Sequence, residues 1–227
     1  MAALQSRAFA AAGWTVLQID LFGCGDSPGH FVEAHWQRWL DDVAHARDWL
    51  QRETGRPPAL WGLRAGCLLT AQAARSLPAA PPMVLWQPTL SGRQHLQQFL
   101  RLKVGSHIVS QADSEPPAPQ RLREQLAQGQ TVEVTGYEIS PALASGLEAA
   151  ELDLRAEPAN IVWLEVQRAP SPELAPASRT RIQKWQQSGH RVDARAVSGP
   201  AFWQTPEITE CPALIEATLD AVRSWPS

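Results

Sequence analysis

The chain has 227 residues, of which 44% are hydrophobic, and it carries a formal net charge of −3. This length and apolar content are enough to bury one sizeable core, so we expect a single domain with at most a small subdomain. The slight acidic excess, with a pI near 6.1, excludes the positive field of a typical nucleic-acid-binding protein and favours small molecules or proteins as partners.

The cysteine pattern argues against disulfides and zinc. Cys24, Cys67 and Cys211 are odd in number, widely spaced and form no CxxC pair, and the six histidines are dispersed. This pattern favours a reducing, cytoplasmic environment. No stretch approaches the roughly 18 apolar residues of a membrane helix, and the start lacks the pattern of a signal peptide. We therefore expect no metal, no cofactor and no membrane span.

The first 88 residues alternate between helical and strand patterns. Residues 1–12 are alanine-rich and predict a helix that ends at Gly13, and residues 14–20 (WTVLQID) are typical of a buried strand. A second helix is expected over 36–55. The alternation then continues with a strand at 59–63, a helix at 64–77 and a strand at 83–88. Such alternation predicts a mostly parallel α/β sheet flanked by helices.

The pattern loosens between residues 89 and 158, which we interpret as an inserted helical lid. Within it we expect a helix at 95–104, a disordered proline-rich connection at 110–119, a second helix at 120–129 and a strand at 131–139. Residues 1–88 and 159–227 are then the core. The second part of the core repeats the alternation, with a strand at 160–166, a helix at 178–189, a strand at 191–197 and a last helix opened by Pro212.

The segment at 59–69 carries the most chemistry. A short strand leads into Gly62-Leu63-Arg64-Ala65-Gly66, and a helix follows. In a G-x-S-x-G nucleophile elbow, the glycines permit a turn so tight that the central residue adopts a strained backbone and projects above the sheet. Here the central residue is Arg64. Arginine stays protonated and cannot attack an acyl carbon, so the elbow lacks a nucleophile.

These residues resemble the α/β-hydrolase superfamily, in which a strand ending in Asp and followed by G-x-G-x-S precedes the elbow. The matching residues are Asp20, Gly23, Gly25 and Ser27. Within the superfamily, the segments DLFGCGDS, LWGLRAG, LWQPTLSGRQHLQQFLRLK, GYEISPAL and PAFWQTPEI are similar to the second type of hydrolase associated with the bacterial exosortase A system. The resemblance implies an α/β-hydrolase fold and a role beside exopolysaccharide synthesis and exosortase-dependent protein sorting.

The same resemblance exposes departures from a working triad. It places the acid after the strand at 160–166 and the histidine after the strand at 191–197, where this chain has only Glu173 and then Phe202 or Trp203. Loss of the nucleophile, acid and base together predicts that Ser-His-Asp catalysis is absent. The superfamily also places a strand between those matched by 14–20 and 59–63. No residues match it here, so we expect a late start and a gap with unpaired backbone groups.

Two functions stay open. One is a pseudoenzyme that binds a small anionic or acyl-type ligand through Arg64, with Leu63, Ala65, Phe202 and Trp203 around it, and that has protein partners in the exosortase/exopolysaccharide system. The alternative is an esterase or thioesterase with an unrecognised nucleophile. Arg64 could equally form a structural ion pair with a buried acid.

Cysteines and turn residues are expected to have ordinary roles. Cys67 lies one turn into a helix with no evident histidine partner, so we interpret it as a small buried apolar residue. Asp26 and Ser27 are expected to be turn and capping residues.

Overall fold

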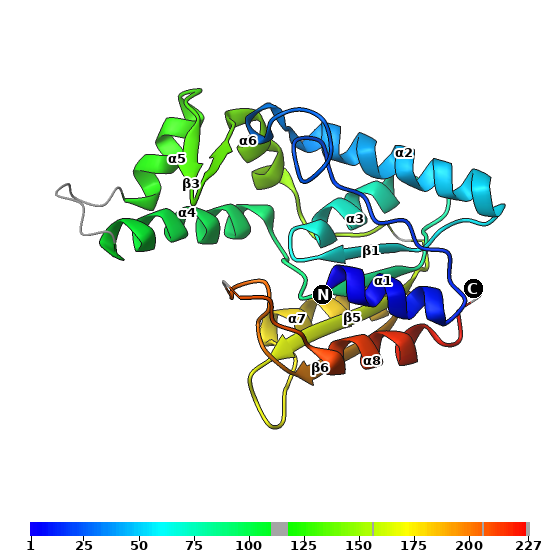
Figure 1. Ribbon diagram of the computed structural model, residues 1–227. Helices are drawn as coiled ribbons and strands as arrows, with labels where there is room; N and C mark the ends of the chain where they lie inside the picture. Colours follow the sequence, from blue (N-terminus) through cyan, green and yellow to red (C-terminus); the bar gives the residue numbers. More distant parts are fainter. Residues whose placement is uncertain (110–117, 156, 206, 226–227) are drawn as a thin grey trace.

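A four-stranded parallel sheet forms the centre of the computed structural model, in the order β1-β2-β5-β6 (Figure 1). Its strands are β1 (Leu60–Leu63), β2 (Met83–Trp86), β5 (Asn160–Gln167) and β6 (Arg191–Ser198). The structure describes residues 1–109, 118–155, 157–205 and 207–225, and only the backbone of 103–109. The predicted parallel α/β sheet is confirmed.

The central strands are apolar on both faces, because helices cover both sides of the sheet. In β2, Met83 and Leu85 join one apolar cluster, whereas Val84 and Trp86 join a second cluster on the opposite face. All four residues are buried, as expected for a parallel strand inside a three-layer arrangement.

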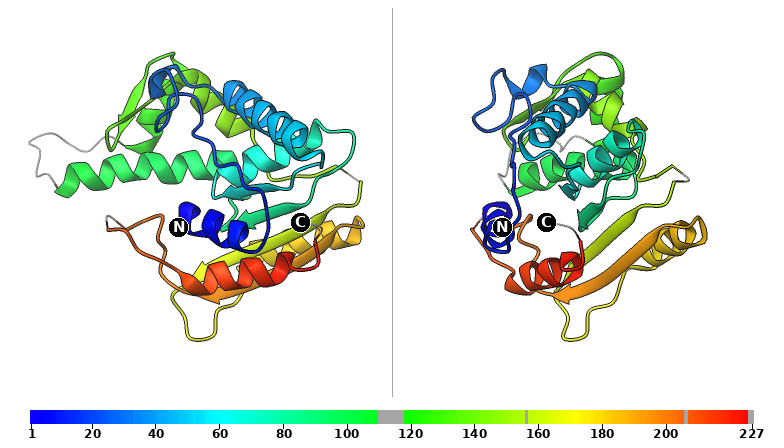
Figure 2. Two further views of the ribbon diagram at one scale, coloured as in Figure 1. Left: turned by 45° about the vertical axis from the view of Figure 1, so that its right-hand side comes forward. Right: turned by 90° about the vertical axis from the view of Figure 1, so that its right-hand side faces the viewer.

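Helices pack on the sheet in two layers (Figure 2). On one face, α1 (Ala2–Ala11) packs against α8 (Pro212–Val222), and α8 contacts β5 and β6. The other face is covered by α2 (Trp36–Thr54), α3 (Gly66–Arg75) and α7 (Pro176–Gln187). These positions follow the predicted helices, with α8 opening at a proline as its sequence indicates.

The elements between β2 and β5 share an apolar cluster of their own. They are α4 (Gly92–Val109), α5 (Pro119–Ala127), β3 (Val132–Val134), β4 (Tyr137–Ile139) and α6 (Pro141–Ala149). The strand expected within 131–139 is an antiparallel hairpin, in which β3 and β4 pair. The connection expected to be disordered falls mostly on 110–117, which lie outside the described residues.

The prediction of a buried strand at residues 14–20 was wrong. The segment runs beside the sheet without joining it, and Leu17 is 36% exposed. A strand needs a hydrogen-bonded neighbour, and the described sheet ends at β1 rather than continuing toward this segment. Residues 14–20 therefore have the sequence pattern of a strand, but they do not form the backbone hydrogen bonds to a neighbouring strand that would make them one.

Candidate functional site

The elbow predicted from the sequence is present at the end of β1. Arg64 has φ of 55°, a left-handed backbone that non-glycine residues rarely adopt. Its N–H donates to the carbonyl of Trp86 on β2 at 2.9 Å, and α3 begins two residues later at Gly66. Residue 64 is therefore held at the sharp turn between a strand and a helix.

The two glycines of the elbow have different roles. A Cβ on Gly62 would lie 2.6 Å from the backbone of Gly66 and from Thr70 Oγ1, so only glycine allows α3 to pack this closely on β1. A Cβ on Gly66 would meet no atom within 4 Å. The sequence motif treated both glycines alike, but only the first is required by packing.

Arg64 directs its side chain toward the segment 89–158 and the loop after β6. Its Nη2 lies 3.4 Å from Gln98 Oε1 on α4, and its guanidinium carbon lies 5.7 Å from the Trp203 ring centre. Partial burial lowers the Arg64 pKa. No carboxylate among the described residues forms an ion pair with Arg64, so the buried-acid partner considered from the sequence is not found within that part of the chain.

The other residues proposed from the sequence differ in how closely they contact Arg64. Phe202 and Trp203 form an edge-to-face pair with ring centres 5.0 Å apart, and both pack with Leu63 against the same apolar cluster. Ala65 precedes α3, and its carbonyl accepts the N–H of Leu68 at 2.9 Å. The structure therefore joins Trp203 to Arg64 directly, whereas Ala65 shapes the turn through its backbone.

Two residues of α4 that sequence reasoning missed lie at this site. His95 and Gln98 are three positions apart, which places them on the same face of the helix. Burial, together with the positive charge of Arg64, lowers the pKa of His95 to about 4. The i, i+3 spacing was visible in the sequence, but nothing in it indicated that this face of α4 meets the elbow.

The carboxylates near the expected acid position serve structural roles. Glu165 on β5 is buried and accepts hydrogen bonds from Trp163 Nε1 and from the Ala175 N–H, both at 2.9 Å. Glu173 lies 3.5 Å from Arg179 on the surface. Neither carboxylate pairs with His95 or Arg64 in the described structure, so no acid-base-nucleophile relay is assembled from them.

The cysteine nearest the elbow is shielded. Cys67 is fully buried, its Sγ lies 3.2 Å from the carbonyl of Gly62, and burial raises the pKa of its thiol. Burial and the neighbouring carboxylates of Asp20 and Asp42 also raise the pKa of Cys24. Since the thiolate is the reactive form, both thiols are poor nucleophiles at neutral pH.

The Asp20 turn is a structural feature. The N–H of Asp26 donates to the Asp20 carboxylate at 3.0 Å, and the Ser27 hydroxyl donates to the Asp20 carbonyl at 2.6 Å. A Cβ on Gly25 would lie 2.3 Å from that carboxylate, and Gly25 also has φ of 53°. This part of the superfamily motif therefore closes a turn in which Asp20 bonds to its own loop.

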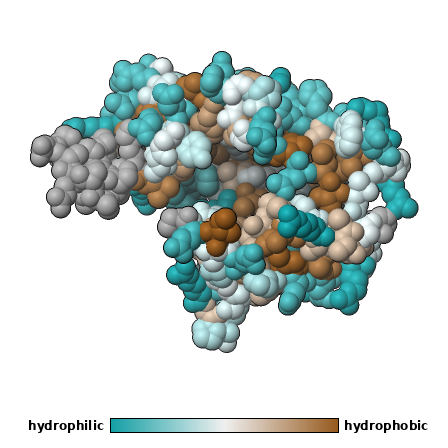
Figure 3. Space-filling model, in the orientation of Figure 1, coloured by the Kyte–Doolittle hydropathy of each residue, from teal (hydrophilic) through white to brown (hydrophobic). Residues whose placement is uncertain are grey.

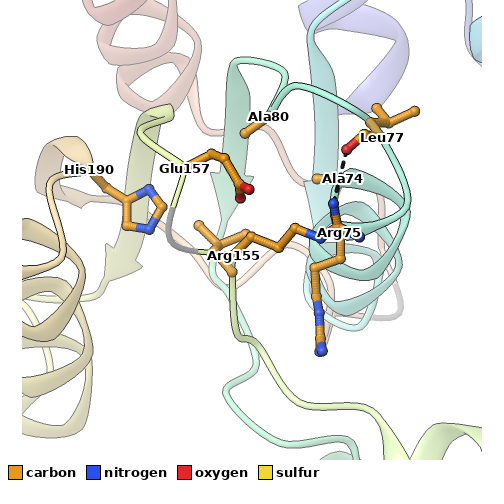
Figure 4. A pocket seen from close by; sticks show the side chains of 8 residues that line it. Ala74, Arg75, Leu77, Ala80, Arg155, Glu157 and His190 are labelled. Carbon is orange, nitrogen blue, oxygen red and sulfur yellow. Dashed lines mark hydrogen bonds between the residues drawn. The ribbon is translucent and has the colours of Figure 1, made fainter.

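Two cavities bear on ligand binding. A cleft of about 830 Å³ runs along β1 and reaches Leu63 and Gly66, but Arg64 lies outside it. The other cavity, of about 10 Å³, lies among Arg155, Glu157 and His190 (Figure 4). This volume is close to that of a single water, so it cannot take an organic ligand.

The described residues contain no group of His, Cys, Asp or Glu side chains arranged to hold a metal ion. Within the same ranges, no helix is both long and apolar enough to cross a membrane.

Comparisons with solved structures identify the class of fold. No protein-family model and no curated protein matches the sequence. A thermostable carboxyl esterase from Bacillus coagulans, in complex with glycerol, aligns at a TM-score of 0.52 and 12% identity over 84% of this chain and 72% of its own. DcsB, in complex with a substrate analogue, aligns at a TM-score of 0.55 and 12% identity, over 98% of this chain and 84% of its own. Tomato methylketone synthase I, in complex with beta-ketoheptanoate, aligns at a TM-score of 0.53 and 13% identity, over 98% of this chain and 91% of its own.

These matches, together with the parallel sheet and the elbow, show that the protein has an α/β-hydrolase fold. At 12–13% identity the likeness extends to the fold alone, and the function has to be argued from the site.

Proposed function

We propose that this protein of α/β-hydrolase fold is a non-catalytic binding protein, in which Arg64 holds the carboxylate or phosphate group of a small anionic or acyl-type ligand. The observation that carries the proposal is a guanidinium at the elbow with no carboxylate partner among the described residues. A partly buried charge is costly unless an opposite charge or strong acceptor compensates it. A bound anion supplies that compensation.

The surroundings of Arg64 suit an anion. Its guanidinium offers a planar fork of donors that matches a carboxylate or phosphate, and the first turn of α3 adds a positive dipole end beside it. Gln98 and Trp203 contact the guanidinium and fix its position, but neither is negatively charged, so the positive charge of Arg64 stays available to an anion. The apolar rings of Phe202 and Trp203 would receive the carbon chain of an acyl ligand.

One structural neighbour supports the ligand class by analogy, since tomato methylketone synthase I is in complex with beta-ketoheptanoate. That ligand joins a short carbon chain to a carboxylate. We further propose that the protein acts in a reducing cytoplasm, which its three free cysteines support, with residues 89–158 forming a lid over the site. Partners in an exosortase/exopolysaccharide system remain part of this proposal on the sequence resemblance alone.

The esterase alternative rests on one further contact. Among the described residues, Thr89 Oγ1 after β2 and His95 Nδ1 on α4 lie 3.4 Å apart, which brings a hydroxyl and an imidazole together near Arg64. The separation exceeds the 2.6–3.2 Å typical of a nucleophile and its base. Thr89 is also only 9% exposed, and a histidine with a pKa of about 4 is a weak base at neutral pH. The binding function is therefore favoured.

The test is a titration of the protein with sodium heptanoate and with inorganic phosphate, read as the melting temperature at constant ionic strength. Saturable stabilisation is expected with at least one of them. Arg64→Ala should abolish the shift, and Arg64→Lys should weaken it because lysine keeps the charge but loses the fork. Arg101→Ala, at an exposed arginine on α4, is the matched control and should keep the shift. No saturable shift in the parent, or a full shift in Arg64→Ala, would refute the proposal.

A further inference from the structure

Two side chains that contact Arg64 hold hydrogen-bond donors without partners. Gln98 Oε1 lies 3.4 Å from Arg64 Nη2, and the amide nitrogen of Gln98 has no partner among the described residues. The indole N–H of Trp203 belongs to the ring next to the guanidinium, is buried and also has no partner within the described chain. A buried donor left unpaired costs free energy. The site is therefore short of acceptors.

His95 adds a donor from the same face of α4. It precedes Gln98 by about one helical turn, and the Thr89 hydroxyl lies 3.4 Å from its Nδ1. A neutral ring whose Nδ1 accepts the Thr89 O–H carries its own proton on Nε2, and a charged ring has a proton on Nε2 as well. No hydrogen bond among the described residues uses Nε2. In either state His95 offers one N–H to a ligand.

The carboxylates of the elements around α4 do not supply the missing acceptors. Glu148 on α6 pairs with Arg123 at 2.6 Å, and Glu151 accepts a hydroxyl group at 2.9 Å. The acidic residues on the other neighbouring elements and two arginines of α4 are exposed: Glu124, Glu133, Glu207, Glu210, Arg93 and Arg101. Burial, followed by the positive charge of Arg64, lowers the pKa of His95, and no carboxylate among the described residues raises it.

The donors come from three elements: the elbow, α4 and the loop after β6. A carboxylate presents two oxygens in one plane, and the planar guanidinium fork of Arg64 binds both. A phosphate monoester keeps a further terminal oxygen outside that plane and carries about −1.5 to −2 charges near pH 7. Donors that surround the guanidinium on several sides therefore fit a tetrahedral anion better than a planar one.

We propose that the Arg64 site binds a phosphate monoester with an alkyl group, in which Arg64 holds two phosphate oxygens while His95 and the Gln98 amide bind the third. This inference rests on the proposed anion-binding function and chooses the ligand class within it. The alkyl group packs on Phe202 and Trp203, whose rings lie beside the guanidinium. Figure 3 shows that the surface is hollowed between the segment 89–158 and the side of the sheet covered by α1 and α8, and that apolar side chains border the hollow.

The second negative charge of the phosphate gives His95 a distinct role. A dianion beside the imidazole opposes the effect of Arg64, so binding should raise the pKa of His95 from about 4 toward neutrality. The bound dianion is then balanced by a protonated His95 as well as by Arg64. His95 is thus the residue that makes the site prefer a dianion to a monoanion.

The experiment compares three ligands that share a six-carbon chain: sodium hexyl phosphate, sodium hexyl sulfate and sodium heptanoate. Hexyl sulfate has the tetrahedral shape of the phosphate but a single charge. Calorimetry at pH 7 and constant ionic strength should show hexyl phosphate binding at least about tenfold more tightly than the other two, and than inorganic phosphate. By NMR titration, saturating hexyl phosphate should raise the pKa of His95, with a gain in proton affinity of at least about tenfold.

Variants of α4 separate charge recognition from folding. His95→Gln keeps a donor but cannot be protonated, so the preference for hexyl phosphate over hexyl sulfate should fall at least about threefold while sulfate affinity stays within about twofold. Gln98→Glu supplies a carboxylate that pairs with Arg64 and should abolish binding of hexyl phosphate. Gln97→Glu makes the same change at the neighbouring exposed residue and should keep the affinity within about threefold.

The outcomes distinguish this inference from the proposed function. Heptanoate binding as tight as that of hexyl phosphate, and still lost in Arg64→Ala, would overturn the ligand class and leave anion binding intact. Equal affinities for hexyl phosphate and inorganic phosphate would overturn the role of the alkyl group. An unchanged preference in His95→Gln would overturn the role of His95. If no ligand bound in a way that depends on Arg64, the proposed function itself would be refuted.

Discussion

The guanidinium carbon of Arg64 lies 5.7 Å from the centre of the Trp203 ring. One residue comes from the elbow after β1 and the other from the loop after β6, the two places where the resemblance to hydrolases would put a nucleophile and a histidine. A cation over an indole face is attracted by about 0.5–1 kcal/mol at an exposed site and by more when desolvated. In this protein the two positions form a cation–aromatic pair in place of a nucleophile and its base.

Trp203→Leu should weaken heptanoate binding by about two- to fivefold, because leucine keeps apolar volume but loses the ring that orients Arg64. The dissociation constant from calorimetry is the measurement. Trp49→Leu, at a tryptophan 47% exposed on α2, is the matched control and should bind like the parent. Equal affinities for the parent and Trp203→Leu would show that the ring does not position the guanidinium.

The elbow glycines should respond differently to alanine. Gly62→Ala places a Cβ 2.6 Å from the backbone of Gly66, so strand and helix must separate, at a cost of about 1–3 kcal/mol in the free energy of unfolding. Gly66→Ala meets no atom and removes a flexible residue from the start of α3, so stability should stay the same or rise by less than about 1 kcal/mol. Urea denaturation of both variants measures the difference. A similar loss in both would argue against the close packing at Gly62.

His95 should make stability depend on pH. Its pKa is about 4 in the folded protein and near 6.5 when unfolded, so the unfolded chain binds more protons between these values. The contribution of neutral His95 is therefore complete above pH 6.5 and is lost as pH falls toward 4, by up to about 1.4 kcal/mol per pH unit. His95→Gln should flatten this part of the stability profile, measured as the free energy of unfolding at each pH.

The same histidine offers a direct check by NMR titration. Arg64→Ala should raise the pKa of His95, because it removes a neighbouring positive charge. An unchanged value would mean that burial alone sets the protonation of this side chain.

Arg64→Ser should not create an esterase. The serine would stand at the elbow, but no carboxylate pairs with His95 among the described residues, and that histidine is a weak base. Hydrolysis of p-nitrophenyl acetate should stay within about tenfold of the parent. A gain of about 100-fold would show that a base is available at the elbow and would favour the alternative esterase function.

The sequence was sufficient for the class of fold. Apolar runs at 83–88 and 160–166, separated by helical patterns, predict parallel strands. A strand that is buried on both faces needs apolar residues at nearly every position, and this can be seen in the local sequence. The elbow could also be predicted from the sequence, because Gly62 and Arg64 lie within a few residues of the strand and helix that define the turn. Local periodicity and tight turns are properties of neighbouring residues.

Residues 14–20 show where this reasoning fails. Their pattern is that of a strand, but strand formation depends on a hydrogen-bonded neighbour that no local pattern reports, and the sheet stops at β1. The environment of Arg64 was hidden for the same reason. Gln98 and Trp203 reach it only because α4 and the loop after β6 converge on the end of β1. Sequence therefore determined the turn and the residue placed in it, whereas the tertiary structure decided which groups surround that charge, because contacts between distant segments depend on packing.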